Sequence, residues 1–378
     1  MRILHVFRTP VGGLFRHVRD LTRGQQARGH QVGILCDSTT GGETAAQLLK
    51  DVEMFCELGV ERMPISRFPG WGDLKGANAV IQHARAIRPD IIHCHGAKGG
   101  FYGRFAARNL GIASVYTPHG GSLHYNWMNP AGAAFLAAEK FLARLGSGMV
   151  FVCRYERDAF ESKIGIGRKP HAIVHNGLWP EEFTQVSAAA NAADVLFIGD
   201  MRRLKGVDVL IDALALCNFS LKHRMTAILV GDGPDMPLFQ ERVKALKLAE
   251  LVTFLGRMDA KAAFARGQLL VMPSRAESFP YVVLEACAAG KPLIASEVGG
   301  IPEILDKAQL VPPGDAAFLA ERLCGVLADP AGMVQNAMAA RENIRRKFTA
   351  DAMVNGVLAF YGRVLGESFS AAIAGRGR

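Results

Sequence analysis

The sequence predicts an α/β protein built from two doubly wound, Rossmann-like domains in tandem, with an interdomain cleft. Three observations support this fold class. The chain has 378 residues, too many for one ordinary hydrophobic core when domains average roughly 150 residues. It is 49% hydrophobic and 21% charged, as globular proteins are, and it contains 41 glycines. Short apolar runs alternate with helical patterns, which is typical of βαβ units around a parallel sheet.

The first series of elements starts at the N-terminus. We expect strands at Ile3–Phe7, Gln31–Cys36, Asp90–Cys94, Ala113–Thr117, Met149–Cys153 and Ile173–Val174. We expect helices at Leu14–Arg28, Leu74–Ile87 and Gly99–Asn109, and one that begins at Arg154. A turn at His175–Pro180 and an Ala-rich stretch at Ser187–Ala193 then break the periodicity. The first domain is therefore predicted to span residues 1–180.

The second series repeats this plan and predicts a second domain over residues 181–349. Its expected strands are Asp194–Gly199, Met225–Gly231, Leu251–Gly256, Leu269–Met272, Pro292–Ala295 and Gln309–Val311. Its expected helices are Val207–Leu216 and Tyr281–Ala289, and a last helical stretch follows at Ala350–Leu365. Ligands of such sheets bind beyond the carboxyl ends of the strands. The residues that follow the strands are therefore the functional candidates.

Composition and charge exclude several classes of protein. No apolar stretch reaches the roughly 18 to 20 residues of a membrane-spanning helix, and the N-terminus lacks a signal-peptide core, so we expect a cytoplasmic protein. The net charge is +9, and residues 1–185 hold 22 Lys and Arg against 15 Asp and Glu. This basic surface suits peripheral contact with an anionic membrane, or a phosphorylated substrate, or it is simply solvated. Nucleic acid is not an expected partner, because no nucleic-acid-binding module is recognisable.

Disulfides and metal sites are not expected. The seven cysteines form no Cys-x-x-Cys pair and lie mostly in apolar runs, as reduced core cysteines do. His93 and His95 look like a metal-binding pair, but no third ligand cluster accompanies them in the sequence. We therefore interpret this segment as the end of a strand.

In each domain, a glycine-containing loop follows the first strand. Gly12 and Gly13 precede a helix, where the main chain and the helix N-terminus can approach an anion, although the same pattern also makes a plain tight turn. In the second domain Gly199 precedes three cations, Arg202, Arg203 and Lys205, at the start of a helix. An anion such as a diphosphate would relieve the repulsion among these cations, whereas the alternative is a solvated basic loop.

Two carboxylates follow the expected strand Leu269–Met272. Glu277 lies in the loop, and Glu285 lies in the first turns of the next helix. Carboxylates accept paired hydrogen bonds from vicinal hydroxyls, so a sugar and a ribose are natural partners. The alternative is that Glu277 is a helix-start charge and Glu285 a core residue with a buried partner. His119 ends a strand of the first domain in a glycine turn, and it is either structural or faces the predicted cleft.

These motifs in this order resemble the GT4 family of retaining glycosyltransferases, which have the GT-B fold. The combination of Glu277-x7-Glu285 with Ala288–Pro292 and Gly299–Glu303 carries most of the resemblance, which covers nearly the whole chain. The segment 93–100, together with 116–120, is similar to members that build exopolysaccharides or other cell-surface glycans. The resemblance implies an enzyme of class EC 2.4, of hexosyltransferase type. It also implies that residues 350–378 form a helix that returns to the N-terminal domain, followed by a tail.

The resemblance also implies a role for each candidate residue. The N-terminal domain would bind the acceptor, and the C-terminal domain would bind a nucleotide-sugar donor, which is a substrate; no cofactor and no metal are implied. The implied catalytic residues are His119 near the sugar, Glu277 on its hydroxyls, and Arg203 and Lys205 on the diphosphate. Further donor contacts are implied at Gly12, Gly13, Gly199, Arg202, Arg257, Met258, Ser278, Phe279, Pro280 and Glu285. The acceptor candidates are Lys98, Arg67 and Trp71.

The implied reaction is transfer with retention from a nucleotide-sugar, UDP-linked in preference to GDP- or ADP-linked, to a glycan or lipid-linked acceptor in cell-surface polysaccharide synthesis. This reaction would take place in the cytoplasm, at the inner face of the membrane. The alternatives on the same fold are a nucleotide-sugar 2-epimerase and a catalytically inactive scaffold subunit.

The chain departs from the family pattern at two positions. Asp200 stands where the family often has arginine, so that Arg202 or Arg203 must replace it. Pro280 stands where the family often has glycine, and proline removes one main-chain donor. Donor contacts at both positions are therefore expected to differ.

Overall fold

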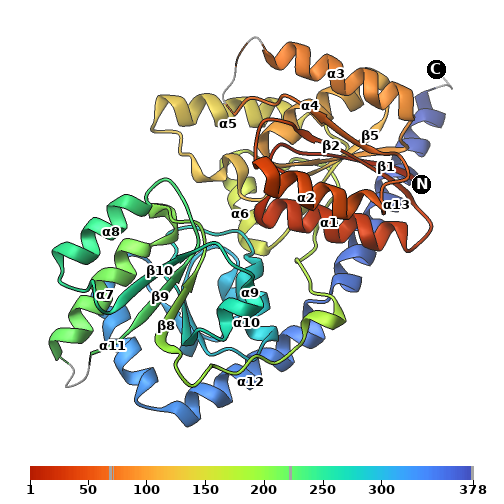
Figure 1. Ribbon diagram of the computed structural model, residues 1–378. Coiled ribbons are helices and arrows are strands. Elements are labelled where there is room, and N and C mark those ends of the chain that lie inside the picture. The colour runs from red at the N-terminus through yellow and green to blue at the C-terminus, as the bar shows by residue number, and fades with distance from the viewer. Residues whose placement is uncertain (68–69, 71, 221–223, 376–378) are drawn as a thin grey trace. The chain divides into compact units, whose positions relative to one another are not determined.

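The chain divides into two compact units, as the predicted fold class requires. The computed structural model describes residues 1–375 except 68, 69, 71 and 221–223. The first unit comprises Met1–Asn176 and the segment that starts at Ala350, and the second comprises Gly177–Thr349. Each unit is a parallel sheet flanked by helices (Figure 1). The division after Asn176 lies a few residues before the boundary placed at residue 180.

The first unit has a seven-stranded parallel sheet in the order β3-β2-β1-β4-β5-β6-β7. Its strands are β1 (Arg2–Val6), β2 (Gln31–Asp37), β3 (Val60–Met63), β4 (Ile91–His95), β5 (Ala113–Thr117), β6 (Gly148–Phe151) and β7 (His171–Ile173). Its helices are α1 (Gly12–Gln26), α2 (Gly42–Glu53), α3 (Gly72–Ile87), α4 (Gly96–Leu110), α5 (Pro130–Ala143), α6 (Arg154–Lys163) and α13 (Ala350–Gly375), with a 3-10 turn η1 (Gly121–His124). The strand order reverses between β1 and β4, and ligands of doubly wound sheets bind at such a switch point.

The buried side chains of the first sheet belong to three clusters, one of which joins Ile34 and Cys36 of β2 to α1 and α2. Ile3, Ile91 and Val115 share one buried cluster with Val354 and Phe360 of α13, which packs beside α1 (Figure 1). The neighbouring strand residues join a second cluster with side chains of α3 and α4. Strands buried on both faces are typical of parallel sheets. Neither α13, with its 26 residues, nor any other helix of the described chain is long and apolar enough to cross a membrane.

The second unit has a six-stranded parallel sheet in the order β10-β9-β8-β11-β12-β13. Its strands are β8 (Ala193–Ile198), β9 (Ala227–Val230), β10 (Val252–Gly256), β11 (Gly267–Met272), β12 (Leu293–Ser296) and β13 (Leu310–Val311). Its helices are α7 (Val207–Ser220), α8 (Met236–Ala245), α9 (Ala260–Phe264), α10 (Tyr281–Ala288), α11 (Ala316–Leu327) and α12 (Pro330–Lys347). Its 3-10 turns are η2 (Pro180–Glu182), η3 (Arg203–Lys205), η4 (Ile301–Glu303) and η5 (Lys307–Gln309). Here the switch point lies between β8 and β11.

Seven helices and strands of the described residues have no counterpart among the predicted segments. They are α2, β3 and α5 in the first unit and α8, α9, α11 and α12 in the second. In α12 the buried side chains are Ala337, Ala340 and Ile344, so that small residues make its apolar stripe faint. β3 is a four-residue edge strand with the sequence Val-Glu-Arg-Met, which is too short to show a period.

The close packing of α4 on β1 gives a test of the fold. A Cβ added at Gly99 would lie 2.3 Å from the carbonyl oxygen of Val6 and 2.8 Å from Cα of Phe7. Because both neighbours are main-chain atoms, Gly99→Ala should lower the free energy of unfolding by about 1 to 3 kcal/mol. Chemical denaturation of the full chain measures this change.

Gly362 in α13 is the matched control. It is exposed, and a Cβ added there meets no atom within 4 Å. Gly362→Ala should therefore leave stability unchanged or raise it by about 0.5 to 1 kcal/mol, as at exposed helix interiors. Equal effects of the two substitutions would contradict the packing described for Gly99.

Candidate active site

The loop after β8 and the loop after β11 touch at the switch point of the second sheet. Gly206 has φ +69°, and a Cβ added to it would lie 1.8 Å from the carbonyl oxygen of Pro273. The amide of Arg275 donates to the carbonyl oxygen of Leu204 at 2.8 Å. Only glycine permits this approach, which brings the predicted basic loop against the predicted glutamate loop.

Lys205 and Glu277 form an ion pair across this junction. Lys205 Nζ lies 2.6 Å from Glu277 Oε1, and the Ser274 hydroxyl donates to the same oxygen at 2.7 Å. The Glu277 side chain is 9% exposed, whereas that of Lys205 is 25% exposed. Within the described part of the chain, no hydrogen bond reaches the second carboxylate oxygen of Glu277. That oxygen is left to accept a hydrogen bond from a ligand hydroxyl.

The loop at Gly299 and Gly300 holds the main chain of the glutamate segment. Gly299 has φ +58°, and a Cβ there would lie 2.0 Å from the carbonyl oxygen of Glu277. The amide of Gly300 donates to the carbonyl oxygen of Ser278 at 2.6 Å. The Gly-Gly pair noted in the sequence thus has a physical role, because it fixes the position of Glu277 from the next loop.

The remaining residues of the glutamate segment differ in what they offer a ligand. Pro280 is the N-cap of α10, and Glu285 lies half-buried within that helix. The side chain of Phe279 is buried and its ring packs on Phe348, with centroids 5.4 Å apart. Phe279 therefore offers a ligand only its main chain.

The two arginines of the basic loop, Arg202 and Arg203, have different surroundings. The amide of Arg203 donates to Asp235 Oδ2 at 2.8 Å, and its carbonyl oxygen accepts from Arg275 at 2.6 Å. Arg203 borders a hollow of about 400 Å³ together with Asp208 and residues of α8. Arg202 is exposed and makes no side-chain hydrogen bond to the described residues.

The other donor candidates of the second unit lie at the ends of neighbouring strands. A Cβ added to Gly231, at the end of β9, would lie 1.8 Å from the carbonyl oxygen of Gly199. Arg257 follows β10, is exposed, and lies 3.9 Å from Asp232, while Met258 is half-buried. All these loops lie at the carboxyl ends of β8, β9 and β10, as the sequence predicts.

Two of the acceptor candidates, Arg67 and Lys98, line a cavity of about 290 Å³ at the β1/β4 switch point of the first unit. Arg8, Arg67 and Lys98 contribute cations to it, and Tyr125 and Phe135 contribute stacked rings with centroids 4.7 Å apart.

Two of these cations, Lys98 and Arg8, interact with neighbouring carboxylates. Lys98 Nζ lies 2.6 Å from Asp73 Oδ1. Burial lowers the pKa of Arg8, and the charge of nearby Asp37 opposes that effect. Trp71 lies outside the described residues.

Two helices begin at this end of the first sheet. Gly12, with φ +78°, is the first residue of α1, and both Gly12 and Gly13 are exposed. Neither α1 nor α4 has an acidic residue in its first turn or a side-chain N-cap. The amides of the first turns are therefore available to an anion.

His119 belongs to a cluster of buried histidines. It has φ +52°, and Glu156 holds its turn by accepting from the amide of Gly120 at 2.6 Å. His95 Nδ1 lies 3.1 Å from His119 Nε2, and the ring of His17 lies 4.8 Å from that of His119.

The interpretation of His93 and His95 as the end of a strand is confirmed, because β4 ends at His95. The sequence offered no third ligand beside this pair, whereas the structure brings His5 to His93 and His95, and brings His17 and His119 to His95. These partners come from β1, α1 and the loop after β5, far apart in the sequence, so that no local spacing reveals them. The visible signal was a polar His5 within an apolar strand.

The sequence also missed Ser274, Arg8 and the Tyr125–Phe135 pair. Ser274 stands three residues before Glu277, and Arg8 follows the first strand, so their positions alone made both of them candidates. The aromatic pair joins η1 to α5, an element that was not predicted.

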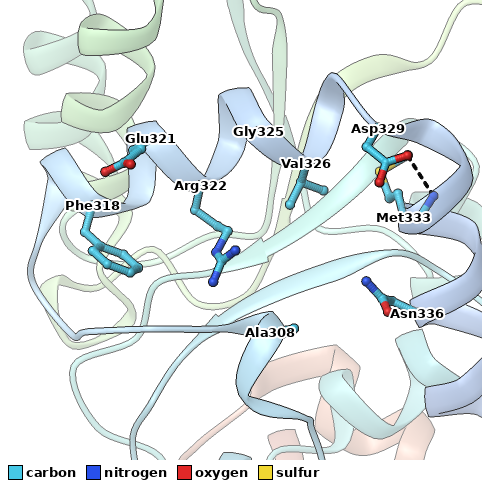
Figure 2. Close-up of a pocket in the computed structure, with 10 residues that line it drawn as sticks. Ala308, Phe318, Glu321, Arg322, Gly325, Val326, Asp329, Met333 and Asn336 are labelled. Atoms are coloured by element: carbon cyan, nitrogen blue, oxygen red, sulfur yellow. Dashed lines mark hydrogen bonds between the residues drawn. The ribbon is translucent and has the colours of Figure 1, made fainter.

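A hollow of about 570 Å³ in the second unit contains none of the predicted residues. It lies between α11, α12 and η5, where Arg322 and Asn336 point toward Ala308 (Figure 2). Its size does not make it a functional site, because its two carboxylates, Glu321 and Asp329, belong to α11 and to the N-cap of α12 and not to a loop that follows a strand.

Comparisons with known proteins agree with this geometry. Residues 12–177 match the family model of the glycosyl transferase 4-like domain, and residues 192–329 match that of glycosyl transferases group 1. The chain is 27% identical to glycogen synthase of Mycobacterium tuberculosis, over 89% of this chain and 88% of that protein. It is 25% identical to N-acetyl-alpha-D-glucosaminyl L-malate synthase of Bacillus anthracis, over 94% of this chain and 95% of that one.

Solved structures share the fold over the whole length. Sucrose-phosphate synthase of Thermosynechococcus elongatus superposes with a TM-score of 0.82 at 21% identity, covering 97% of this chain and 100% of that one. Anabaena HepE in complex with UDP and glucose superposes with a TM-score of 0.81 at 23% identity, covering 96% of this chain and 100% of that one. The two domain models together cover most of the chain, and the relatives are glycosyltransferases. The chain therefore belongs to the GT4-type, or group 1, glycosyltransferases of the GT-B fold, which are enzymes of class EC 2.4.

Proposed function

We propose that this enzyme transfers a sugar, with retention of anomeric configuration, from a UDP-sugar to a glycan or lipid-linked acceptor in cell-surface polysaccharide synthesis. The observation that carries the proposal is the Lys205–Glu277 pair, which places a cation and a hydroxyl-binding carboxylate 2.6 Å apart at the switch point of the second sheet. UDP in preference to GDP or ADP is supported by the Anabaena HepE structures, which contain UDP or UDP-glucose. No metal and no cofactor take part in the proposed reaction.

Each group of the second unit has one task in this proposal. Lys205, together with Arg202 or Arg203, neutralises the diphosphate, and Arg202 is the better placed because Arg203 borders a separate hollow. The unoccupied oxygen of Glu277 accepts from the donor sugar, and Glu285 accepts from the ribose. The main chain around Arg257 and Met258 faces the base.

The proposed chemistry needs no nucleophile from the protein. The acceptor hydroxyl attacks the anomeric carbon on the face from which the diphosphate leaves. The bond from that carbon to the diphosphate oxygen breaks, and the leaving diphosphate takes the proton of the hydroxyl. Glu277 Oε1 is held by Lys205 and Ser274, so this carboxylate positions the sugar rather than attacking it. The contribution of the protein is preorganised positive charge at the leaving group.

The cavity of the first unit is assigned to the acceptor. Its three cations Arg8, Arg67 and Lys98 suit a phosphate or diphosphate, and the stacked Tyr125 and Phe135 suit a sugar or a lipid-proximal group. A lipid-linked acceptor carries such groups together. It would also bring the enzyme to the inner face of the membrane, where the basic first unit is attracted to anionic headgroups.

Nucleotide titration tests the donor assignment. UDP should raise the midpoint of thermal unfolding more than GDP or ADP, because a ligand at 100 times its dissociation constant adds about 2.7 kcal/mol to stability. Glu285→Ala should abolish the shift. Glu241→Ala, at an exposed position of α8, is the control and should retain it. A larger shift with GDP or ADP would overturn the choice of base, and an unchanged shift in Glu285→Ala would overturn the role of that residue.

Removal of the Lys205 cation tests the leaving-group assignment. Lys205→Met should lower kcat by about 100- to 1,000-fold, the effect of removing one preorganised donor. The free energy of unfolding should fall by only about 1 kcal/mol, because the pair is partly exposed. Lys244→Met, at an exposed position of α8, is the control. Turnover equal to that of the control would remove Lys205 from the mechanism.

Product analysis separates the proposal from its alternatives. With a UDP-α-sugar and a lipid-linked acceptor, proton NMR should show an α-linked product and release of UDP. Epimerised donor without acceptor would indicate a 2-epimerase. A protein that binds UDP but gives neither product with any of a panel of acceptors would indicate a scaffold subunit.

A further inference from the structure

Five histidines gather beneath the cavity of the first unit. His5 comes from β1, His17 from α1, His93 and His95 from β4, and His119 from the loop after β5. All but His119 are buried, and His119 is half-buried. Buried histidines in such numbers require an account of every ring nitrogen.

Hydrogen bonds assign the ring protons of His17. Its Nδ1 lies 2.9 Å from the side-chain oxygen of Asn176, which can only accept, so Nδ1 carries the proton. Its Nε2 is then a bare lone pair. That nitrogen is buried and has no hydrogen-bond partner among the described residues. Leaving such a buried group without a partner costs about 1 to 3 kcal/mol.

A second chain of hydrogen bonds orients His95. The Gln25 side-chain oxygen accepts from His5 Nε2 at 2.8 Å, so His5 Nδ1 is unprotonated and accepts from His95 Nε2 at 2.9 Å. His95 Nδ1 therefore carries a lone pair, and it faces His119 Nε2 at 3.1 Å. Burial lowers the pKa of His17 to about 4 and holds the pKa values of His95 and His119 well below their usual range. Burial therefore favours the neutral form of all three rings.

The three nitrogens have the spacing of a metal site. His17, His95 and His119 can each offer one ring nitrogen, and these three nitrogens lie within 4.8 Å of one another. Two imidazole nitrogens bound tetrahedrally to zinc, each at about 2.0 to 2.1 Å, are roughly 3.3 Å apart. The His95–His119 pair at 3.1 Å already has nearly this separation.

We propose that His17, His95 and His119 form a binding site for a divalent transition-metal ion of the zinc class. Bound His17 and His95 would each donate the proton on their other nitrogen, to Asn176 and His5 respectively, which is the usual arrangement around metal-bound histidines. His119 would move its proton from Nε2 to Nδ1, so that binding releases no proton from the three rings. His95 also lines the cavity, which supplies the entry path and leaves the fourth position to water.

The ion is not part of the proposed transfer reaction, which uses groups of the second unit and assigns no step to the His119 side chain. The site lies wholly within the first unit, and it joins α1, β4 and the loop after β5, so that binding should stabilise the fold of that unit. The proposal does not depend on the donor or the acceptor.

Cobalt and zinc titration of the full chain tests the site. Protein stripped with EDTA and dialysed should bind one Co²⁺ per chain, with the visible absorption of four-coordinate cobalt, and one Zn²⁺ should raise the thermal unfolding midpoint. His17→Phe preserves the ring volume and removes the orphaned nitrogen, and His119→Gly suits the positive φ at that position. Both variants should lose at least tenfold in affinity for either ion and should lose the visible band.

His171→Ala is the matched control, because His171 is an exposed histidine of the same unit. It should bind both ions as the parent chain does. A UDP-induced shift in the variants would show that the second unit is still folded. No stoichiometric binding by the parent chain, or binding that survives both His17→Phe and His119→Gly, would overturn the proposal.

Discussion

The site of this glycosyltransferase depends on main-chain atoms that come closer together than any side chain would allow. At the β8/β11 switch point, Gly206 lies against the carbonyl of Pro273 and Gly299 against that of Glu277. A Cβ would lie 1.8 Å from the oxygen at the first position and 2.0 Å from it at the second, so either loop would have to move. The distance between Lys205 and Glu277 follows from these contacts, because each residue belongs to a loop that glycine holds in place. The charged groups do the chemistry, but the glycines set their positions.

The first unit has the same switch-point topology as the second, but different side chains lie at its switch point. Its crevice holds cations and aromatic rings above a layer of neutral imidazoles, whereas the second unit presents carboxylates and main-chain amides. Buried polar groups of this kind are tolerated only when nearly all of them have partners. Gln25 and Asn176 serve this purpose, since they fix the tautomers of His5 and His17.

Features that follow from the local sequence pattern could be predicted, whereas features that depend on contacts between distant segments could not. Strands such as β8 and β11 are short apolar runs bounded by glycine or proline, so their positions and the loops after them could be predicted. Helix α12 could not, because its buried stripe consists largely of alanines. The tertiary contacts of His17, on α1, with His95 and His119 leave no local pattern. Phe279 lies in the expected loop, but its ring packs inward on Phe348, a direction that spacing does not encode.

The path of the chain through the two units has a consequence for synthesis. The first unit is interrupted after Asn176 and completed only from Ala350 onward, so the second unit is an insertion within it. Strand β1 is made before the second unit, yet Val354 and Phe360, which share a cluster with Ile3 and Ile91, are made after it. Until the inserted unit has been translated, α13 cannot pack on this face of the first sheet, although Leu21 of α1 already belongs to the same cluster. The inserted unit has its own core, and it can therefore fold before α13 is available to pack on the first sheet.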